Sequence, residues 1–157
     1  MIRRLLVAAL LVVAATAGTL TVAHAQGPGR RADNPRLRAA LQELREARKS
    51  LQEAQDTWPQ GYKERALVST QSAINSIKGI LQVQNVDNFK GIDRSPDFYK
   101  RFPNHPRLRA ALADLRDARD ELRAAKDDFG NLKEQAYDDI DVAVGDVVTL
   151  IRHQPNR

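Results

Sequence analysis

An internal repeat constrains this chain more than any other feature. The fourteen residues that begin at Pro35 recur 71 positions later, from Pro106, with eleven identities and two Glu/Asp exchanges. A weaker match follows at an offset of 70, in which Lys63-Glu64 corresponds to Lys133-Glu134. Each unit therefore spans about 47 residues, and two copies are too few for a solenoid. The duplication predicts two similar supersecondary units within one domain.

The strong half of each unit has a seven-residue apolar period. A large apolar side chain recurs every seven residues, and an alanine recurs three places after each one. This pattern is typical of a helix that buries one seam, and the alanine layers let a partner helix approach closely. The large residues are Leu37, Leu44, Leu51 and Trp58 in the first copy, and Leu108, Leu115, Leu122 and Phe129 in the second. The alanines are Ala40, Ala47, Ala54, Ala111, Ala118 and Ala125.

The expected helix boundaries follow from proline and glycine. Pro35 and Pro106 stand where a first helical residue is expected, so Asn34 and His105 are the candidate N-caps, Asn34 being the better one. The first helices are expected to run to about Asp56 and about 127. Turns at 57–61 and 129–131 precede second helices with their own apolar stripes. These stripes contain Ala66, Ala73, Ile77 and Ile80 in one copy, and Ala136, Ile140, Ala143, Val147 and Leu150 in the other.

These patterns predict an all-α fold, in which a duplicated antiparallel helical hairpin forms a four-helix bundle. The hairpins span residues 34–81 and 105–152, and a linker at 82–104 joins them. A hairpin of this size is marginal alone, so the two are expected to pack together. In the alternative arrangement, each hairpin pairs with another chain across the long linker.

The N-terminus has the pattern of a secretory signal peptide. Arg3 and Arg4 precede an apolar run, and Ala23-His24-Ala25 is a cleavage motif. We therefore expect a leader at 1–25, a flexible segment at 26–33, and a periplasmic or extracellular protein without an integral membrane segment after cleavage. An uncleaved anchor is the alternative. Cleavage would lower the net charge from +5 to +3, because the leader holds two arginines and no acid. For an exported protein, this charge is weak evidence for nucleic acid, and we expect no nucleic-acid partner.

The linker mixes basic and aromatic residues, which is a pattern of binding surfaces. Ser95-Pro96 could start a single helical turn. In the alternative interpretation, the aromatic rings cover one end of the bundle while the charges stay in solvent. The candidate binding surface is Phe89, Lys90, Arg94, Phe98, Tyr99, Lys100, Arg101 and Phe102.

The residue inventory excludes several kinds of chemistry. The chain has no cysteine, and its single methionine is Met1, so thiolate sites, disulfides and covalent haem attachment are ruled out. The mature histidines are only His105 and His153, and no Glu-x-x-His motif of a di-iron bundle occurs. No phosphate-binding loop or nucleophile elbow is present. We expect no catalytic residues, no cofactor and no dedicated metal ligands.

Charges on the helices allow three further expectations. Glu134, Asp138 and Asp141 share one face of the last helix and could hold a divalent cation weakly, although a solvated face is the simpler interpretation. The basic first helix could pair with this acidic last helix, either within the bundle or between chains, through Arg36, Arg38, Arg45, Arg48 and Lys49. Arg119 and Asp114 are also expected to form an ion pair on the surface of their own helix.

The second copy resembles small exported bacterial proteins of uncharacterised function. They share the form H-P-x-L-R-A-A followed by D-F-G, which His105–Ala111 and 128–130 match. The first copy departs from this form at Asn34 and at Thr57–Pro59. The resemblance implies a helical hairpin and export, and it brings no activity or site residues.

The sequence thus predicts a non-enzymatic, exported helical bundle that acts by binding or as an envelope component, with a protein partner or self-association. One alternative is a periplasmic holdase-type chaperone, because basic residues flank the apolar stripes. However, the Leu-Thr-x-x-Gln signature of one such group is missing. The other alternative is a bundle that binds divalent cations weakly.

Overall fold

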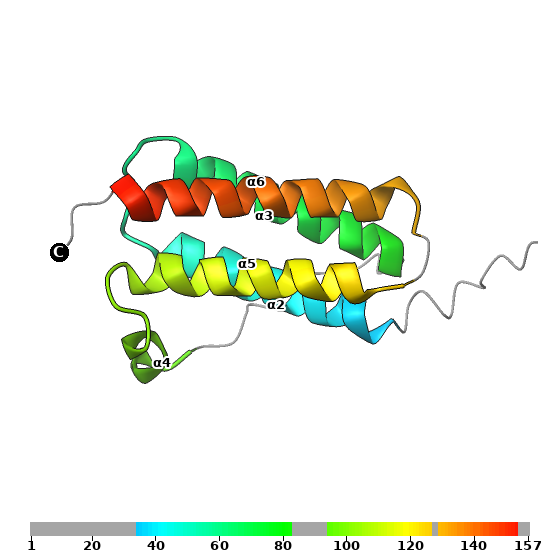
Figure 1. Ribbon diagram of the computed structural model, residues 1–157, viewed down its shortest axis with the longest axis horizontal. Helices are drawn as coiled ribbons and strands as arrows, with labels where there is room; N and C mark the ends of the chain where they lie inside the picture. Colours follow the sequence, from blue (N-terminus) through cyan, green and yellow to red (C-terminus); the bar gives the residue numbers. More distant parts are fainter. Residues whose placement is uncertain (1–33, 83–93, 127–128, 154–157) are drawn as a thin grey trace, which may run out of the picture.

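The computed structural model describes residues 34–82, 94–126 and 129–153. Within these ranges the chain forms four long helices and one short helix (Figure 1). The predicted leader, the segment at 26–33, and Phe89 and Lys90 lie outside the described residues. The helices are α2 (Pro35–Glu53), α3 (Tyr62–Leu81), α4 (Pro96–Lys100), α5 (Pro106–Ala124) and α6 (Asn131–His153).

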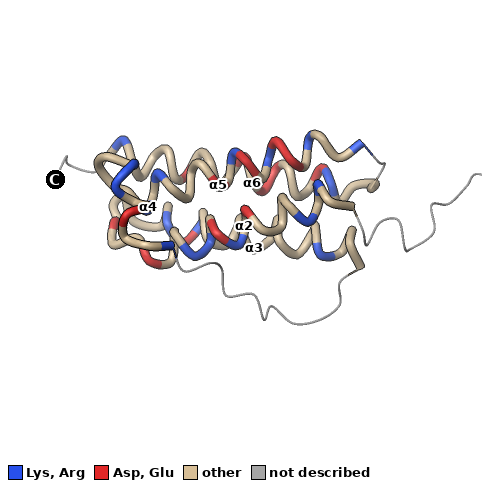
Figure 2. The backbone as a smooth tube through the Cα atoms, turned by 90° about the horizontal axis from the view of Figure 1, so that it is seen from below, with Lys and Arg blue, Asp and Glu red and all other residues tan. Residues whose placement is uncertain are grey.

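The four long helices form an antiparallel bundle within one chain, which confirms the predicted fold. The closest packing is between the repeats, α2 against α5 and α3 against α6, while α2 with α3 and α5 with α6 form the hairpins. Figure 2 shows α5 and α6 in one layer and α2 and α3 in the other. Each helix therefore runs antiparallel to both of its neighbours, and α2 lies diagonally across from α6 (Figures 1 and 2).

An approximate two-fold axis relates the two hairpins. Arg36 at the start of α2 pairs with Glu121 near the end of α5, while Arg107 at the start of α5 pairs with Glu53 at the end of α2. Arg36 and Arg107 are equivalent positions of the repeat, 71 residues apart. The duplicated sequence thus folds so that each copy completes the core of the other.

The core follows the predicted seams closely. All six seam leucines and all six seam alanines are buried, as are the stripes of α3 and α6. Because alanine has a small side chain, the seam alanines allow the backbones of neighbouring helices to approach one another closely while the core stays packed. Among the described residues, no helix is both long and apolar enough to cross a membrane.

The seam ends earlier than the sequence period implied. Helices α2 and α5 stop at Glu53 and Ala124, rather than near Asp56 and 127, because Ala54 and Ala125 adopt extended backbone conformations. Trp58 consequently lies beyond the helix and is 60% exposed, so its assignment to the seam was wrong. Phe129 also lies beyond its helix, yet it is buried against the core.

The lysine that both copies share in the weaker part of the repeat has a structural role at these helix ends. Lys63 donates a hydrogen bond to the carbonyl of Ala54, and Lys133 donates one to the carbonyl of Ala125. Each lysine therefore satisfies a carbonyl at the end of the preceding helix and complements its negative dipole end. This shared role accounts for a lysine at the same position in both second helices.

Within the bundle, two predicted charge pairings are wrong. The helix α2 packs on α5 and α3, not on α6, so the basic first helix does not face the acidic last helix. The acidic helix α6 instead pairs with its neighbours, Asp146 with Arg65 of α3 and Asp141 with Arg119 of α5. Arg119 therefore does not pair with Asp114, which binds a different arginine.

Candidate functional site

The helix α4 lies against the start of α5, close to where α2 ends (Figure 1). Residues of these three elements line a pocket there. The pocket has a volume of about 610 Å³, which is within the range of small-molecule sites. Its walls come from the end of α2, from α4 and from the loop that leads into α5. We call it the α4 pocket. Its lining includes Glu53, Asp56, Pro96, Tyr99, Lys100, Phe102, His105, Pro106 and Arg107.

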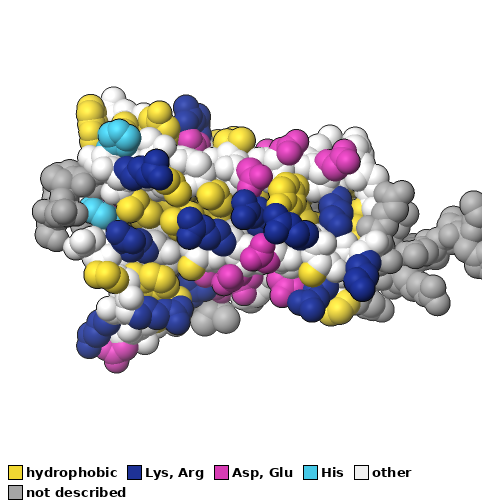
Figure 3. All heavy atoms as spheres, viewed as in Figure 1, with side chains coloured by type: hydrophobic (Ala, Val, Ile, Leu, Met, Phe, Trp, Pro, Cys, Tyr) yellow, Lys and Arg dark blue, Asp and Glu magenta, His cyan; other side chains and the backbone are white. Residues whose placement is uncertain are grey.

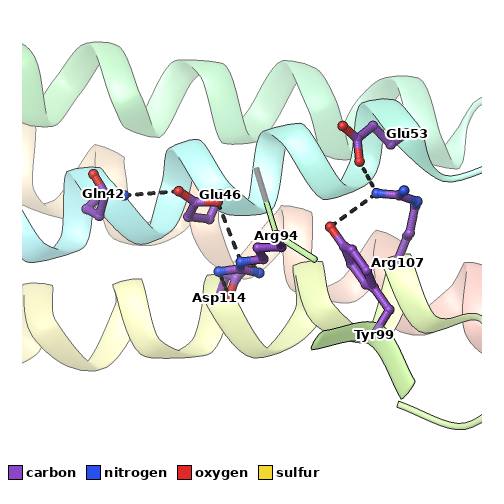
Figure 4. A network of polar contacts seen from close by, with 7 residues as sticks. All are labelled: Gln42, Glu46, Glu53, Arg94, Tyr99, Arg107 and Asp114. Carbon is purple, nitrogen blue, oxygen red and sulfur yellow. Dashed lines mark hydrogen bonds and ion pairs between the residues drawn. The ribbon is translucent and has the colours of Figure 1, made fainter. Parts of the chain in front are cut away.

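An arginine of the linker anchors α4 to the bundle. The guanidinium of Arg94 donates two hydrogen bonds to Asp114, from Nη1 at 2.7 Å and from Nη2 at 2.9 Å. Its Nε lies 3.6 Å from Oε2 of Glu46. The other carboxylate oxygen of Glu46, Oε1, accepts a hydrogen bond of 3.0 Å from Nε2 of Gln42. Arg94 therefore bridges α2 and α5, two residues before α4 begins (Figure 4).

The carboxylates around Arg94 come from equivalent positions of the two repeats. Glu43 corresponds to Asp114, and Glu46 corresponds to Asp117, so the Glu/Asp exchanges of the repeat meet at the α2–α5 interface. Burial raises the pKa of Asp114, and the bonds from Arg94 offset this only in part. Burial and the charges of Asp114 and Asp117 raise the pKa of Glu43.

Aromatic rings continue the attachment from Arg94 into α4. The guanidinium of Arg94 lies 4.3 Å from the ring centre of Phe98, and that of Arg101 lies 3.8 Å from the same ring. Phe98 also contacts Tyr99 edge-on and Phe102 at a tilted angle. Stacking of arginine on aromatic rings contributes about 0.5–2 kcal/mol per pair. Arg94 and Phe98 thus hold α4 in place.

A second arginine shapes the pocket wall itself. Arg107 pairs with Glu53, and its Nη1 donates a hydrogen bond of 3.1 Å to the hydroxyl of Tyr99 (Figure 4). Its guanidinium also lies 4.5 Å from the centre of the Tyr99 ring. These contacts join the ends of α2, α4 and α5. Tyr99 and Phe102 provide the aromatic surface of the pocket, and both are half-buried.

His105 is the residue of this site that the sequence misassigned. Its side chain does not cap α5, in contrast to Asn34, which accepts hydrogen bonds from the backbone N–H groups of Arg36 and Leu37 at the start of α2. Instead Asn104 and His105 have φ angles of 50° and 52°, and the imidazole of His105 turns inward. Its Nδ1 lies 3.3 Å from Oδ1 of Asp56. In non-glycine residues such backbone conformations are uncommon, and they concentrate at functional sites.

The candidate surface that the sequence proposed divides into two groups. Tyr99, Lys100 and Phe102 line the α4 pocket. Arg94, Phe98 and Arg101 instead form the attachment of α4, with Arg94 held between buried carboxylates. The helix α4 begins at Pro96, at the predicted turn, although the side chain of Ser95 forms no cap.

Several lining residues lie outside the aromatic linker and were not among the predicted binding residues. His105 and Arg107 belong to the second repeat, while Glu53 and Asp56 come from the first. One feature of the sequence does single out His105. The two repeats agree closely after Pro35 and Pro106, but the residue before the proline is Asn34 in the first copy and His105 in the second. Figure 3 shows cationic side chains around α4 and the start of α5, beside hydrophobic surface.

The acidic face of α6 does not form a cation site in the part of the chain that the structure describes. No group of three or more histidine, aspartate or glutamate side chains is placed there to hold a metal ion. Asp141 lies 2.9 Å from Nη1 of Arg119, so one member of the proposed triad already has a cationic partner.

Comparison of the chain with protein-family models, with curated proteins and with solved structures found no match. The geometry of the α4 pocket is therefore the basis for a functional proposal.

Proposed function

We propose that this chain is an exported, non-catalytic binding protein that recognises a small ligand in the α4 pocket. The observation that carries the proposal is the pocket itself, a hollow of about 610 Å³ with an aromatic wall and several polar side chains. The proposed export rests on the leader pattern at 1–25.

The way in which α4 is attached supports this proposal. A connection between two hairpins needs only to span the distance between them, and a solvated loop would serve. Here the connection carries a largely buried arginine that binds Asp114 and stacks on Phe98, and the ring of Phe98 contacts that of Phe102 beside it. Rigid support of the surrounding residues is what a binding pocket requires, because ordering them on binding would reduce affinity.

The site favours binding over catalysis. The nearest approach to a general base is His105, whose Nδ1 faces Asp56, and the pocket lining offers no serine, threonine or cysteine nucleophile beside it. Arg107 is engaged with the hydroxyl of Tyr99 and with the carboxylate of Glu53. These residues are suited to hold a ligand in place.

Native mass spectrometry tests the proposal. The mature protein is purified gently from its own envelope, together with a Gln55→Trp variant that fills the pocket. Gln55 is an exposed lining residue, and Lys126 is its exposed counterpart 71 residues later, so Lys126→Trp is the matched control. We expect a bound mass on the wild type and on the control, and its loss from Gln55→Trp. A bound mass that all three retain, or a bare chain in every case, would contradict the proposal.

A further inference from the structure

The charges in the lining of the α4 pocket balance one another. With histidine counted as neutral, the lining contains two acids and two cations, which are Glu53, Asp56, Lys100 and Arg107. Glu53 forms an ion pair with Arg107, and Oδ1 of Asp56 lies 3.3 Å from Nδ1 of His105. Nζ of Lys100 lies 2.5 Å from Oδ1 of Asp97 on the same helix. Each charged side chain of the pocket therefore already has a partner.

This balance disfavours a charged ligand. An anion that binds Arg107 would compete with Glu53, and a cation that binds Glu53 would compete with Arg107. Either ion would leave one member of a partly buried pair without compensation, and this cost would reduce its affinity. The lining is therefore better suited to an uncharged molecule.

The same side chains retain the capacity to form hydrogen bonds with a ligand. Arg107 uses Nη1 for its contacts with both Glu53 and the hydroxyl of Tyr99, so its Nε and Nη2 groups remain available as donors (Figure 4). Glu53 contacts Arg107 through Oε2, so Oε1 remains available as an acceptor. The side-chain amides of Gln55 and Asn104 also belong to the lining, and they form no hydrogen bond with the residues that the structure describes. The pocket thus offers donors and acceptors in planar groups.

Aromatic surface lies beside these polar groups. Tyr99 and Phe102 are half-buried parts of the lining, and Pro96 and Pro106 extend the apolar surface. A purely apolar ligand could pack on this surface, but it would also cover polar groups without replacing their hydrogen bonds to water. The lining therefore favours a molecule that has an apolar face and a polar edge.

We infer that the α4 pocket binds an uncharged sugar. The C–H groups of a sugar ring form an apolar face, and each of its hydroxyls both donates and accepts hydrogen bonds. Neighbouring hydroxyls donate to Glu53 and accept from Arg107 without separating this pair, while the C–H face packs against Tyr99 and Phe102. This inference rests on the proposed binding function and names the class of the ligand. The same chemistry is found in a free sugar and in the terminal residue of a neutral polysaccharide.

Sugars that differ mainly in charge test the inference. Glucose, galactose, mannose and xylose are titrated into the mature protein at pH 6.5 and followed by calorimetry and by saturation-transfer NMR. Glucuronate and galacturonate add a carboxylate to the ring, and glucosamine and galactosamine add an ammonium group. We expect at least one neutral sugar to bind saturably, with a Kd at least about tenfold lower than those of the charged sugars. Equal or tighter binding of a charged sugar, or no binding of any neutral sugar, would overturn the inference.

Native mass spectrometry separates this inference from the proposed binding function. A bound mass that Gln55→Trp abolishes, in a protein that binds no sugar, would show that the ligand class is wrong while the pocket remains a binding site. A wild type without a bound mass and without sugar binding would contradict the binding function as well.

Methyl glycosides distinguish the two sources of the sugar. In a methyl glycoside the anomeric hydroxyl is blocked, as it is in a residue at the end of a polysaccharide. If the methyl glycoside of the preferred sugar binds as tightly as the free sugar, the pocket accepts a chain end. If the methyl glycoside binds at least about tenfold more weakly, the ligand is a free sugar whose anomeric hydroxyl is enclosed.

Two substitutions test the residues that carry the inference. Glu53→Gln leaves Arg107 without its acidic partner, so this variant should bind the uronates at least about tenfold more tightly than the wild type does. Phe102→Leu removes an aromatic ring of the lining and should weaken binding of the neutral sugar about tenfold. Gln52→Ala is the control, because Gln52 is exposed next to Glu53 but lines a different groove. Continued rejection of the uronates by Glu53→Gln, unchanged sugar binding by Phe102→Leu, or equal weakening by Gln52→Ala would overturn the inference.

Discussion

Replacement of Arg94 by methionine should destabilise the bundle, because it removes the cation that lies between two buried carboxylates. Asp114 and Glu46 are 5% and 3% exposed, and Arg94 forms two hydrogen bonds to the first and lies 3.6 Å from the second. Removing one partner of a buried pair costs about 3–5 kcal/mol. Because Arg94 is at the edge of the bundle, where water can replace it, we expect about 3 kcal/mol, and a Tm lower by on the order of 10 °C.

The loss should depend on pH in a specific direction. The pKa of Asp114 is raised by burial, although Arg94 opposes this, so removal of Arg94 should raise it further. A carboxyl whose pKa is higher in the folded state stabilises the fold below its ordinary pKa, and that stabilisation disappears as the pH rises through the folded-state value. The deficit of Arg94→Met should therefore be largest near neutral pH and should shrink as the pH falls toward about 4.

Urea unfolding followed by far-ultraviolet circular dichroism, at neutral and acidic pH, measures both effects. Arg101→Met is the control, because Arg101 also stacks on Phe98 but is exposed. The double variant Arg94→Met/Asp114→Asn removes the buried charge of Asp114 together with its partner, so it should recover a substantial part of the loss. The reasoning would be refuted if Arg94→Met stayed within about 0.5 kcal/mol of the wild type, or if its deficit grew on acidification.

Four further outcomes can be checked by thermal or urea unfolding. Asn34→Ala should cost about 1 kcal/mol, because it removes the cap of α2. Lys63→Met and Lys133→Met should each cost about 1 kcal/mol, and their effects should add, since the lysines bond helix ends on opposite sides of the bundle. Leu115→Ala should cost about 2–5 kcal/mol, and Leu44→Asp should abolish cooperative unfolding, as both leucines are fully buried. Millimolar Ca²⁺ should leave the Tm of the wild type unchanged, because no group of side chains among the described residues is placed to hold a metal ion. Binding of Ca²⁺ to the folded state would raise the Tm.

The residues of the proposed binding site were only partly accessible to sequence reasoning. The mixture of aromatic and basic residues in the linker drew attention to Tyr99, Lys100 and Phe102, and the structure places these three residues in the lining of the α4 pocket. Arg94 belongs to the same run, but its role depends on Asp114 from another helix. Composition identifies residues that are able to bind, while only their three-dimensional neighbours determine whether they face a pocket or a buried carboxylate.

His105 illustrates the same limit. Its position before Pro106 predicted a cap by analogy with Asn34, because the repeat places both residues at the same point. Whether such a residue caps depends on its backbone conformation, and the φ of 52° turns the imidazole toward Asp56 instead. Asp56 is 49 residues earlier in the chain, so no local pattern could have predicted this contact.

The sequence by itself determined the helices and the core. The seven-residue period, the prolines and the duplicated segment specify which residues are buried, since burial of an amphipathic stripe depends only on local spacing. The tertiary structure alone decided which helices pair, which arginine meets which carboxylate, and where α4 leaves a pocket. These features depend on contacts between residues far apart in the chain, and the same amphipathic helices could satisfy their local periods in more than one arrangement.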